Sequence, residues 1–513
     1  MTSKSHTLNR RDFMKAAGGA MGLAALAGCA APQAATTGQA GGAASEGIPQ
    51  VHLWASARCR PEGSNPERLE AVANVMRDAL NIDPVAIVAP SGSAAREKLN
   101  LTLGARDQEL DVFVSNWPDY KDAIIPINDL LDQYGQDIVA AHREINFAGM
   151  QDSEGNIWGV PRLGVMGHTT PVWFRTDWLE AAGMSQPETL EEGEAAMAAF
   201  KEMDSEASIV TTNIQHLRLA TVGGFTEYGY SNWFDEQSGK IMPAELQPGF
   251  IDWVTKMNEW WNNDWFFKET FASFDAEQVF KSLKVGMWAG WYSRVTIIWE
   301  RIRQSGEAGD ADLGFALNFS GPAGLMKTHN VSATSAYMVT KKAKNPEACI
   351  QYMNYQFQGL PDDSTNAVVG NFGEEGVDWE WDNPDEKYFV NRLITGCGDE
   401  YAGELQAAVG LGSEHHYAPR GDLERHFLHI RDYTQAYDSG KMPVDFNVAY
   451  DIPLIKEQAP GYDDIQRLLD EETVKFISGI RPLGEWDSFL ADLNTAGLEA
   501  WSDAHTEQYL AYQ

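Results

Sequence analysis

Segments with the patterns of strands and helices alternate between residues 50 and 116, and this alternation constrains the fold more than any other feature. QVHLWAS (50–56), NIDPVAIVAP (81–90) and LDVFVSN (110–116) have the alternating or continuously apolar character of strands. NPERLEAVANVMRDAL (65–80) and AREKLNLTLGA (95–105) place apolar side chains at helical spacing. This order predicts an α/β fold with a parallel sheet, in which ligands bind beyond the carboxyl ends of the strands.

Later segments predict further helices and one strand. PETLEEGEAAMAAFKEMD (187–204) begins with a capping box formed by Thr189 and Glu192. KVGMWAGWYSR (284–294) predicts a strand that enters a glycine-rich turn, and residues 471–513 predict three helices with Gly479 and Gly497 as stops. A helix over 250–264 has one apolar stripe, expected in the core, formed by Phe250, Trp253, Val254, Met257 and Trp261.

The N-terminus has the pattern of an export signal. Arg10 and Arg11 in NRRDFMK resemble the twin-arginine signal, and the apolar run 16–28 is shorter than the roughly 20 residues that a spanning helix needs. Small residues before Cys29 resemble a lipobox, in which the cysteine is lipidated and becomes the first residue of the mature chain. We therefore expect a twin-arginine lipoprotein signal over 1–28 and a flexible tether over 29–48.

Size and charge exclude several classes of function. More than 460 residues follow Gly47, which suggests at least two lobes. The net charge of −35 would repel nucleic acid and anionic membrane surfaces, so neither is expected as a partner. The cysteines beyond Cys29 are Cys59, Cys349 and Cys397; three cannot all pair, so one bridge and buried free thiols both stay open.

Motifs for catalysis are missing from the sequence. It contains no G-x-S-x-G, H-E-x-x-H or Walker loop, and His415 and His416 are adjacent, which makes them a poor chelating pair. A pair of catalytic carboxylates can be neither identified nor excluded in so acidic a chain. We therefore expect a binding protein without a cofactor or metal, with an anchored polysaccharide-active enzyme as the alternative.

The order of sequence blocks resembles the family 1 extracellular solute-binding proteins of carbohydrate ABC importers, especially the LipO-like lipoproteins. The most specific block is VWFRTDWLEAAGMSQPETLEE (172–192), which follows GNIWGVPR (155–162). The other blocks, in order, are EKLNLTLGARDQELDVFV, IIPINDLLDQYGQDI, GKIMPAELQPGF, FKSLKVGMWAGW, NPEACIQYMNY, NFGEEGVDWE and VKFISGIRPLGEWDSFLADLNTAGL.

The resemblance implies a two-lobed α/β fold of the periplasmic-binding-protein type, type II-like, with the ligand in the cleft between the lobes. One lobe would take 49–167 and 331–372, and the other 168–330 and 373–513. Relatives that bind alginate oligosaccharides carry a calcium loop after the helix that ends near Asp204. Here residues 203–215 lack the alternating oxygen ligands and the turn glycine of such loops, so we expect no calcium there.

Candidate ligand contacts follow from the chemistry of sugars, which offer an apolar ring face and a rim of hydroxyl groups. The expected contacts are Trp54, Arg58, Asn116, Trp117, Arg162, Trp288, Trp291, Tyr292 and Trp379. Gly286 and Gly290 leave room beside Trp288 and Trp291 for a ring to approach. For the tryptophans, packing in the core is the alternative; for Arg162 it is a structural salt bridge.

Together these features predict a monomeric lipoprotein on the outer face of the cell membrane. It would capture a sugar or oligosaccharide, close its lobes around it by a hinge motion, and deliver it to ABC permease subunits. A peptide-binding importer component is a variant of this function, and an adhesin without a small ligand is a third class.

Overall fold

The first of two principal sheets contains the strands expected between residues 50 and 116. The computed structural model describes residues 47–511 with gaps, the longest at 57–65, 162–169, 327–334, 393–404 and 406–447. The sheet runs β2-β1-β3-β13-β4. Its strands are β1 (Gln50–Ser56), β2 (Asp83–Ala89), β3 (Val112–Asn116), β4 (Val160–Pro161) and β13 (Ser335–Val339). β1 pairs in parallel with β2 and β3, as predicted, but β13 is antiparallel to β3 and β4, so the sheet is mixed.

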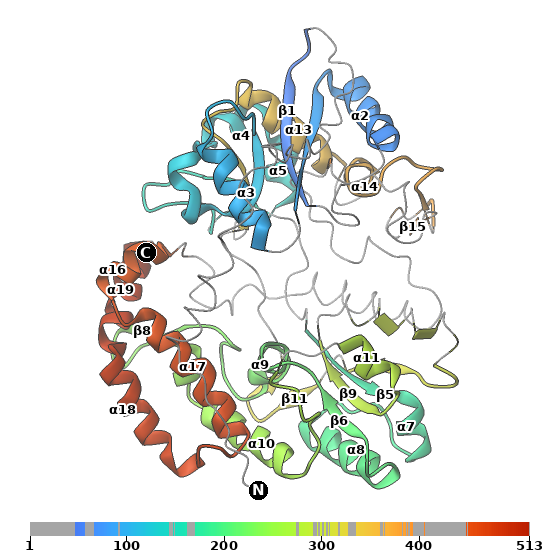
Figure 1. Cartoon of the computed structure of the whole chain (residues 1–513), viewed down its shortest axis with the longest axis vertical. Helices are drawn as coiled ribbons and strands as arrows, with labels where there is room; N and C mark the ends of the chain where they lie inside the picture. The colour runs from blue at the N-terminus through green and yellow to red at the C-terminus, as the bar shows by residue number, and fades with distance from the viewer. Residues whose placement is uncertain are drawn as a thin grey trace, which may run out of the picture. The chain divides into compact units, whose positions relative to one another are not determined.

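Helices pack around this sheet (Figure 1). The apolar side chains between the sheet and the helices form a core of their own. The expected helices are α2 (Pro66–Leu80) and α3 (Ser93–Gly104). The others are α4 (Asn128–Tyr134), α5 (Gln136–Ala141), α13 (Pro346–Phe357) and α14 (Thr365–Phe372). α13 packs against α4 and α5, more than 200 residues earlier in the chain, so this core forms only when distant segments meet.

The second sheet runs β10-β5-β9-β6 and has a separate, larger core. Its strands are β5 (Val172–Arg175), β6 (Ser208–Thr211), β9 (Val285–Ala289) and β10 (Leu313–Phe315). The larger helices around it are α8 (Leu190–Met203), α9 (Ile214–Thr221), α10 (Phe250–Asn262), α17 (Tyr462–Ile477), α18 (Trp486–Ala496) and α19 (Leu498–Ala511). α10 packs against α17, which joins the C-terminal helices to this core.

Shorter elements complete the description. The helices are α7 (Thr176–Ala181), α11 (Ala276–Lys281) and α16 (Ile452–Gln458), with 3-10 turns η1 (Trp117–Ala123), η2 (Val222–Gly224), η3 (Ala244–Leu246) and η8 (Leu483–Glu485). The two-stranded sheets are β7 (Trp233–Asp235) with β8 (Lys240–Met242), β11 (Ser320–Gly321) with β12 (Gly324–Leu325), and β14 (Trp379–Trp381) with β15 (Val390–Arg392). No helix in the described ranges combines the length and the apolar character that crossing a membrane requires.

Several local sequence signals are confirmed. The Thr189 hydroxyl accepts a hydrogen bond from the Glu192 amide (3.2 Å), and the Glu192 carboxylate accepts one from the Thr189 amide (3.1 Å). Gly497 ends α18 with a left-handed φ of 104°, a conformation that favours glycine. On α10 the buried stripe includes Trp260, whereas Trp261, which was expected in it, is only half-buried.

The segment after α14 packs with the first sheet. Trp379 and Trp381 belong to the first core, and the Arg68 guanidinium on α2 lies 2.5 Å from the Asp378 carboxylate. The first lobe was expected to end at residue 372. The packing extends beyond that residue, because Trp379 and Trp381 lie in the core of the first sheet.

Candidate functional site

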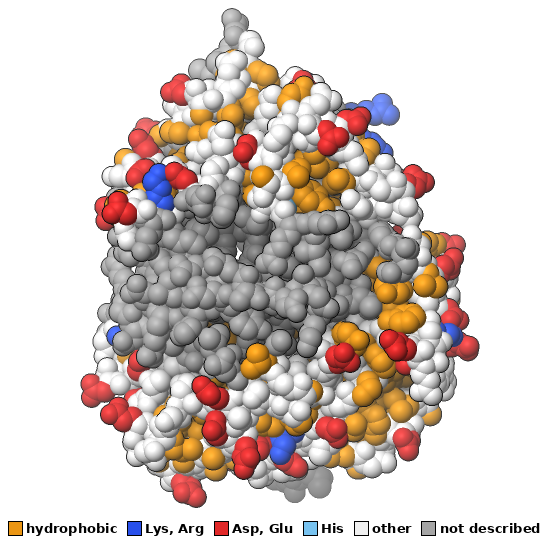
Figure 2. All heavy atoms as spheres, turned by 180° about the vertical axis from the view of Figure 1, so that it is seen from behind, with side chains coloured by type: hydrophobic (Ala, Val, Ile, Leu, Met, Phe, Trp, Pro, Cys, Tyr) orange, Lys and Arg blue, Asp and Glu red, His pale blue; other side chains and the backbone are white. Residues whose placement is uncertain are grey.

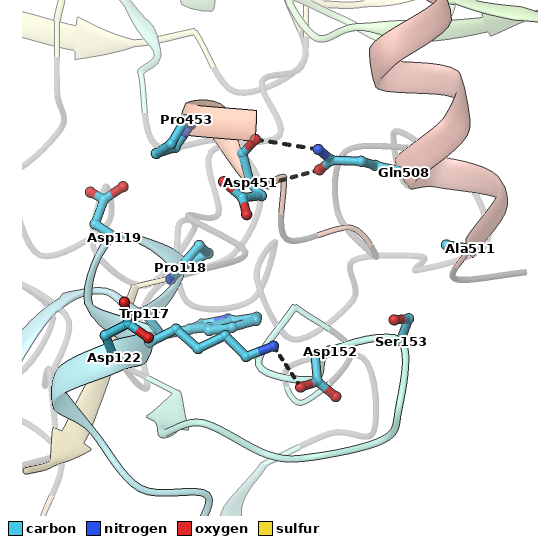
Figure 3. Close-up of a pocket in the computed structure, with 11 residues that line it drawn as sticks. Trp117, Pro118, Asp119, Asp122, Asp152, Ser153, Asp451, Pro453, Gln508 and Ala511 are labelled. Atoms are coloured by element: carbon cyan, nitrogen blue, oxygen red, sulfur yellow. Dashed lines mark hydrogen bonds and ion pairs between the residues drawn. The ribbon is translucent and has the colours of Figure 1, made fainter. Parts of the chain in front are cut away.

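A cavity of about 460 Å³ lies beside η1, which directly follows the carboxyl end of β3 (Figure 3). Pro118 stands in the first turn of η1, where its missing N–H costs no helical hydrogen bond. The lining residues are Trp117, Pro118, Asp119, Lys121, Asp122, Asp152, Ser153, Asp451, Pro453, Gln508 and Ala511. They come from η1, the turn at 152–153, the start of α16 and the end of α19.

Asp152 organises one wall of the cavity. Its carboxylate accepts hydrogen bonds from the Lys121 ammonium (3.0 Å), the Trp158 indole N–H (2.8 Å) and the backbone amides of Glu154 and Asn156 (both 3.0 Å). Burial alone would raise the pKa of Asp152, but these donors outweigh it and hold the pKa well below its usual range. Asp152 is therefore ionised at neutral pH and forms an ion pair with Lys121.

The opposite wall is held by Gln508 and Asp451. The Gln508 side-chain oxygen accepts from the Asp451 amide (2.7 Å), and its amide group donates to the Asp451 carbonyl (3.3 Å), which ties α19 to α16. The Asp451 carboxylate accepts from the Leu454 amide (3.0 Å) and so caps α16. The chain thus presents carboxylates and amide groups around one space, which suits a ligand rich in hydroxyl groups.

Trp54 and Asn116 lie on the adjacent strands β1 and β3, and Trp117 begins η1 directly after β3. Trp117 lines the cavity but is only 3% exposed; its indole N–H donates to the Gly149 carbonyl (2.8 Å), and its ring stacks on Trp158 at 5.9 Å. Exposed Asn116 is the last residue of β3. Trp54 is half-buried against the cluster that contains Trp117. Of these three residues only Trp117 is among the described lining residues of the cavity, where it presents little ring surface; Trp54 and Asn116 stay predicted ligand contacts.

The expectation that Trp288 presents its ring to a ligand is wrong for the described structure. Trp288 is 4% exposed and packs on Phe280, with 3.6 Å between ring centroids. The neighbouring glycines make room for core side chains: a Cβ at Gly286 would lie 2.5 Å from the Phe200 ring, and one at Gly290 would lie 3.0 Å from the Trp288 indole nitrogen.

Trp379 is also a core residue and not an exposed ligand contact. Its side chain is fully buried, its indole N–H donates to the Gly373 carbonyl (2.9 Å), and its ring contacts Trp381 edge to face. The aromatic pair of β14 is thus explained by packing against the first sheet.

Several predicted residues lie outside the described residues. These are Arg58, Arg162, Trp291, Tyr292, the export-signal residues Arg10 and Arg11, Cys29, Cys59, Cys397, His415 and His416. Cys349 is described and is a buried free thiol.

Sequence reasoning missed most of the polar lining. Asp119 and Asp122 are three residues apart in WPDYKD, directly after the predicted strand, so their position beside Trp117 was a usable signal. Asp451 and Gln508 are more than 300 residues away from η1 in the sequence, and only the fold brings them to the cavity.

The loop after α8 pairs its carboxylates with a lysine. The Lys284 ammonium lies 3.2 Å from the Glu206 carboxylate and 3.8 Å from that of Asp204. Within the part of the chain that the structure describes, no group of three or more His, Cys, Asp or Glu side chains is placed to hold a metal ion.

Two α/β sheets with separate cores, and a polar cavity beyond the end of a strand, define a binding protein of the two-lobed periplasmic type. The model of the bacterial extracellular solute-binding protein family matches residues 69–357, more than half of the chain. The chain belongs to this family, whose members bind solutes outside the cytoplasm and are not enzymes. No curated protein matches the chain.

Solved structures share the fold over most of both chains. A solute-binding protein of Bifidobacterium longum infantis, described as associated with an ABC transporter and binding HMO, is 14% identical, with a TM-score of 0.65 over 91% of this chain and 99% of its own. The Streptococcus pneumoniae ABC-transporter protein FusA, in complex with kestose, is 17% identical (TM-score 0.61; 91% of this chain and 99% of its own). The alginate-binding protein AlgQ2 is 18% identical (TM-score 0.61; 90% and 98%).

Proposed function

We propose that this protein captures a sugar or oligosaccharide outside the cytoplasm and delivers it to an ABC importer. The observation that carries the proposal is the chain's membership of the solute-binding family. Its fold is shared over 90–91% of this chain and 98–99% of proteins described as alginate-binding, in complex with kestose, or HMO binding. The cavity beside η1 supports a saccharide ligand because aspartate, lysine and glutamine side chains surround a space large enough for one.

The ligand is held between two lobes that close on it by a hinge motion. The first lobe is built on the sheet of β1 and extends to Trp381, and the second is built on the sheet of β9. Arg162, Trp291, Tyr292 and Arg58 are proposed as further ligand contacts, because their sequence positions flank the strands and crossing segments.

A thermal-shift screen of the purified protein against neutral and charged oligosaccharides tests this function, with peptides as the comparison set. A ligand that binds only the folded state at 100 times its Kd adds about 2.7 kcal/mol of stability. We expect a saccharide to raise the melting temperature and to reduce the radius of gyration in solution scattering. Stabilisation by peptides alone would contradict the saccharide assignment, and sustained release of reducing ends from glycans would favour an enzyme.

The N-terminal region exports the chain and anchors it by a lipid on Cys29. Two or more acyl chains at about 0.8 kcal/mol per buried CH₂ give stable anchoring, whereas one chain gives reversible binding. In cells expressing Cys29→Ser, we expect the protein to move from the membrane fraction to the soluble exported fraction. Arg10→Lys with Arg11→Lys should stop export, while Cys29→Ser alone should not. An equally membrane-bound Cys29→Ser protein would contradict the anchor.

A further inference from the structure

We propose that the cavity beside η1 selects saccharides by charge: it accepts an uncharged or amine-bearing sugar and rejects one that carries carboxylate, sulfate or phosphate groups. This inference rests on the proposed saccharide-binding function and adds the substrate class. The shared fold does not determine the charge of the ligand, so we infer this charge from the side chains that line the cavity in this chain.

The lining is strongly negative. Four aspartates, Asp119, Asp122, Asp152 and Asp451, face one lysine, Lys121. Asp119 and Asp122 lie on the same short helix, and both are exposed to the space. An anionic ligand would be placed among like charges, and each such contact in a partly solvated site weakens binding several-fold.

Among the described lining residues the cation is Lys121, and it is already engaged. The Lys121 ammonium lies 3.0 Å from the Asp152 carboxylate and 5.0 Å from the centre of the Trp158 ring, so it is held by an ion pair and a cation–π contact. Outside the lining, Arg96 contacts Asp119 at 3.3 Å, but this arginine is 69% exposed and its charge is screened by solvent. The Asp152 carboxylate therefore offsets much of the charge of Lys121, which weakens its attraction for an incoming anion.

The carboxylates do not converge on a metal ion. Figure 3 shows Asp119 and Asp122 on η1, Asp152 on the neighbouring turn and Asp451 across the cavity. In the described part of the chain, no three acidic or histidine side chains come close enough to hold a metal. Carboxylates spread around a space of about 460 Å³ instead suit acceptance of hydrogen bonds from several hydroxyl or amine groups of one ligand.

The net charge of the whole chain adds to the same selection. The chain carries 74 acidic and 39 basic residues, and Figure 2 shows Asp and Glu side chains spread over the face that it draws, with few Lys and Arg. Such a field slows the approach of anions and attracts cations, and the effect weakens with added salt.

Matched saccharides separate charge from shape. The probes are trimers of β-1,4-glucose, β-1,4-mannose and α-1,4-galactose, each compared with its uronic-acid form, and the glucosamine trimer as the amine form. Their Kd values for the purified protein are measured by calorimetry at 20 mM and 500 mM NaCl. We expect the neutral or amine form of the accepted backbone to bind on the order of tenfold more tightly than its uronate at low salt, with a smaller ratio at high salt.

Variants assign the selection to the cavity. Asp119→Asn with Asp122→Asn should narrow the neutral-to-uronate ratio several-fold, while Asp78→Asn, which removes an exposed carboxylate outside the lining, should leave the ratio unchanged. Melting curves check that each variant folds. A uronate that binds as tightly as its neutral form, or an unchanged ratio in the double variant, overturns the charge selection and leaves the proposed function intact. Failure of every saccharide to bind overturns both.

Discussion

Replacing Trp288 with alanine is expected to destabilise the protein without weakening ligand binding by the folded form. Trp288 is 4% exposed on β9, between strand neighbours Trp173 and Thr211, and its ring rests on Phe280. Its removal leaves a cavity in the small core that includes Trp173 and Trp299.

The size of the loss follows from the buried area. A tryptophan buries about 150–250 Å², which at about 25 cal/mol/Å² corresponds to about 4–6 kcal/mol. Residual compactness of the unfolded chain makes this an upper estimate, so we expect a loss of about 3–5 kcal/mol in the free energy of unfolding. If both lobes unfold together, an unfolding entropy of about 2.1 cal/mol/K per residue gives about 1 kcal/mol/K for about 470 residues. The melting temperature would therefore fall by only about 3–5 °C.

Urea unfolding followed by circular dichroism is the more sensitive assay, because it reports the free energy directly. The saccharide Kd is measured on the same variant under conditions where it is folded. Half-buried Trp261 on α10 provides the control, since Trp261→Ala should cost less stability. A Trp288→Ala protein as stable as the wild type but with weakened saccharide binding would refute the core assignment and restore Trp288 as a ligand contact.

Three further predictions concern buried titratable groups. Asp152→Asn should lower the free energy of unfolding by about 1.5–3 kcal/mol at pH 7. Because the pKa of Asp152 is depressed in the folded state, the difference in stability between the wild type and the variant should shrink below about pH 4. Equal urea midpoints of the two proteins at pH 7 would contradict this prediction. Burial lowers the pKa of His505 to about 4, so the wild type should lose up to about 3 kcal/mol as the pH falls from 6.5 to 4; His505→Gln should flatten that part of the profile in urea titrations, and an unchanged slope would argue against a buried neutral imidazole. Burial raises the pKa of the Cys349 thiol, so in a chain with Cys59→Ser and Cys397→Ser, Ellman's reagent at pH 8 should react with it only after unfolding; rapid labelling of the native protein would show that the thiol is accessible.

Local sequence patterns predicted the individual helices and strands well, whereas the pairing of strands that are distant in the sequence could not be predicted from them. Each strand and helix of residues 50–116 is predicted by the spacing of its own apolar residues, and the capping box at Thr189 lies within one helical turn. Both signals therefore come from residues that are close in the sequence. The antiparallel insertion of β13 depends on pairing with residues more than 200 positions earlier, for which hydrophobic periodicity carries no signal.

The candidate site divides in the same way. Trp117 and Asn116 were predicted because the carboxyl end of a parallel strand is a general binding position. Trp117 lines the cavity, whereas Asn116 is not among its described lining residues and stays a prediction. Trp288 was misplaced because a tryptophan beside glycines is compatible with both a ligand platform and a tight core. Trp379 was misplaced because its neighbours in the sequence do not distinguish these two roles either. The contacts of the glycines distinguish a ligand platform from a tight core. The space beside Gly286 is occupied by the Phe200 ring, and the space beside Gly290 by Trp288 itself.

The position of β13 also governs the order in which the chain can assemble during synthesis. β13 lies between β3 and β4, so a nascent chain that ends before Ser335 has the edge of β3 unpaired and β4 without its neighbour. Unpaired strand edges template association with other chains. The first sheet therefore stays open until about two-thirds of the polypeptide has been made, and truncated products that stop before this strand should be prone to aggregation and degradation.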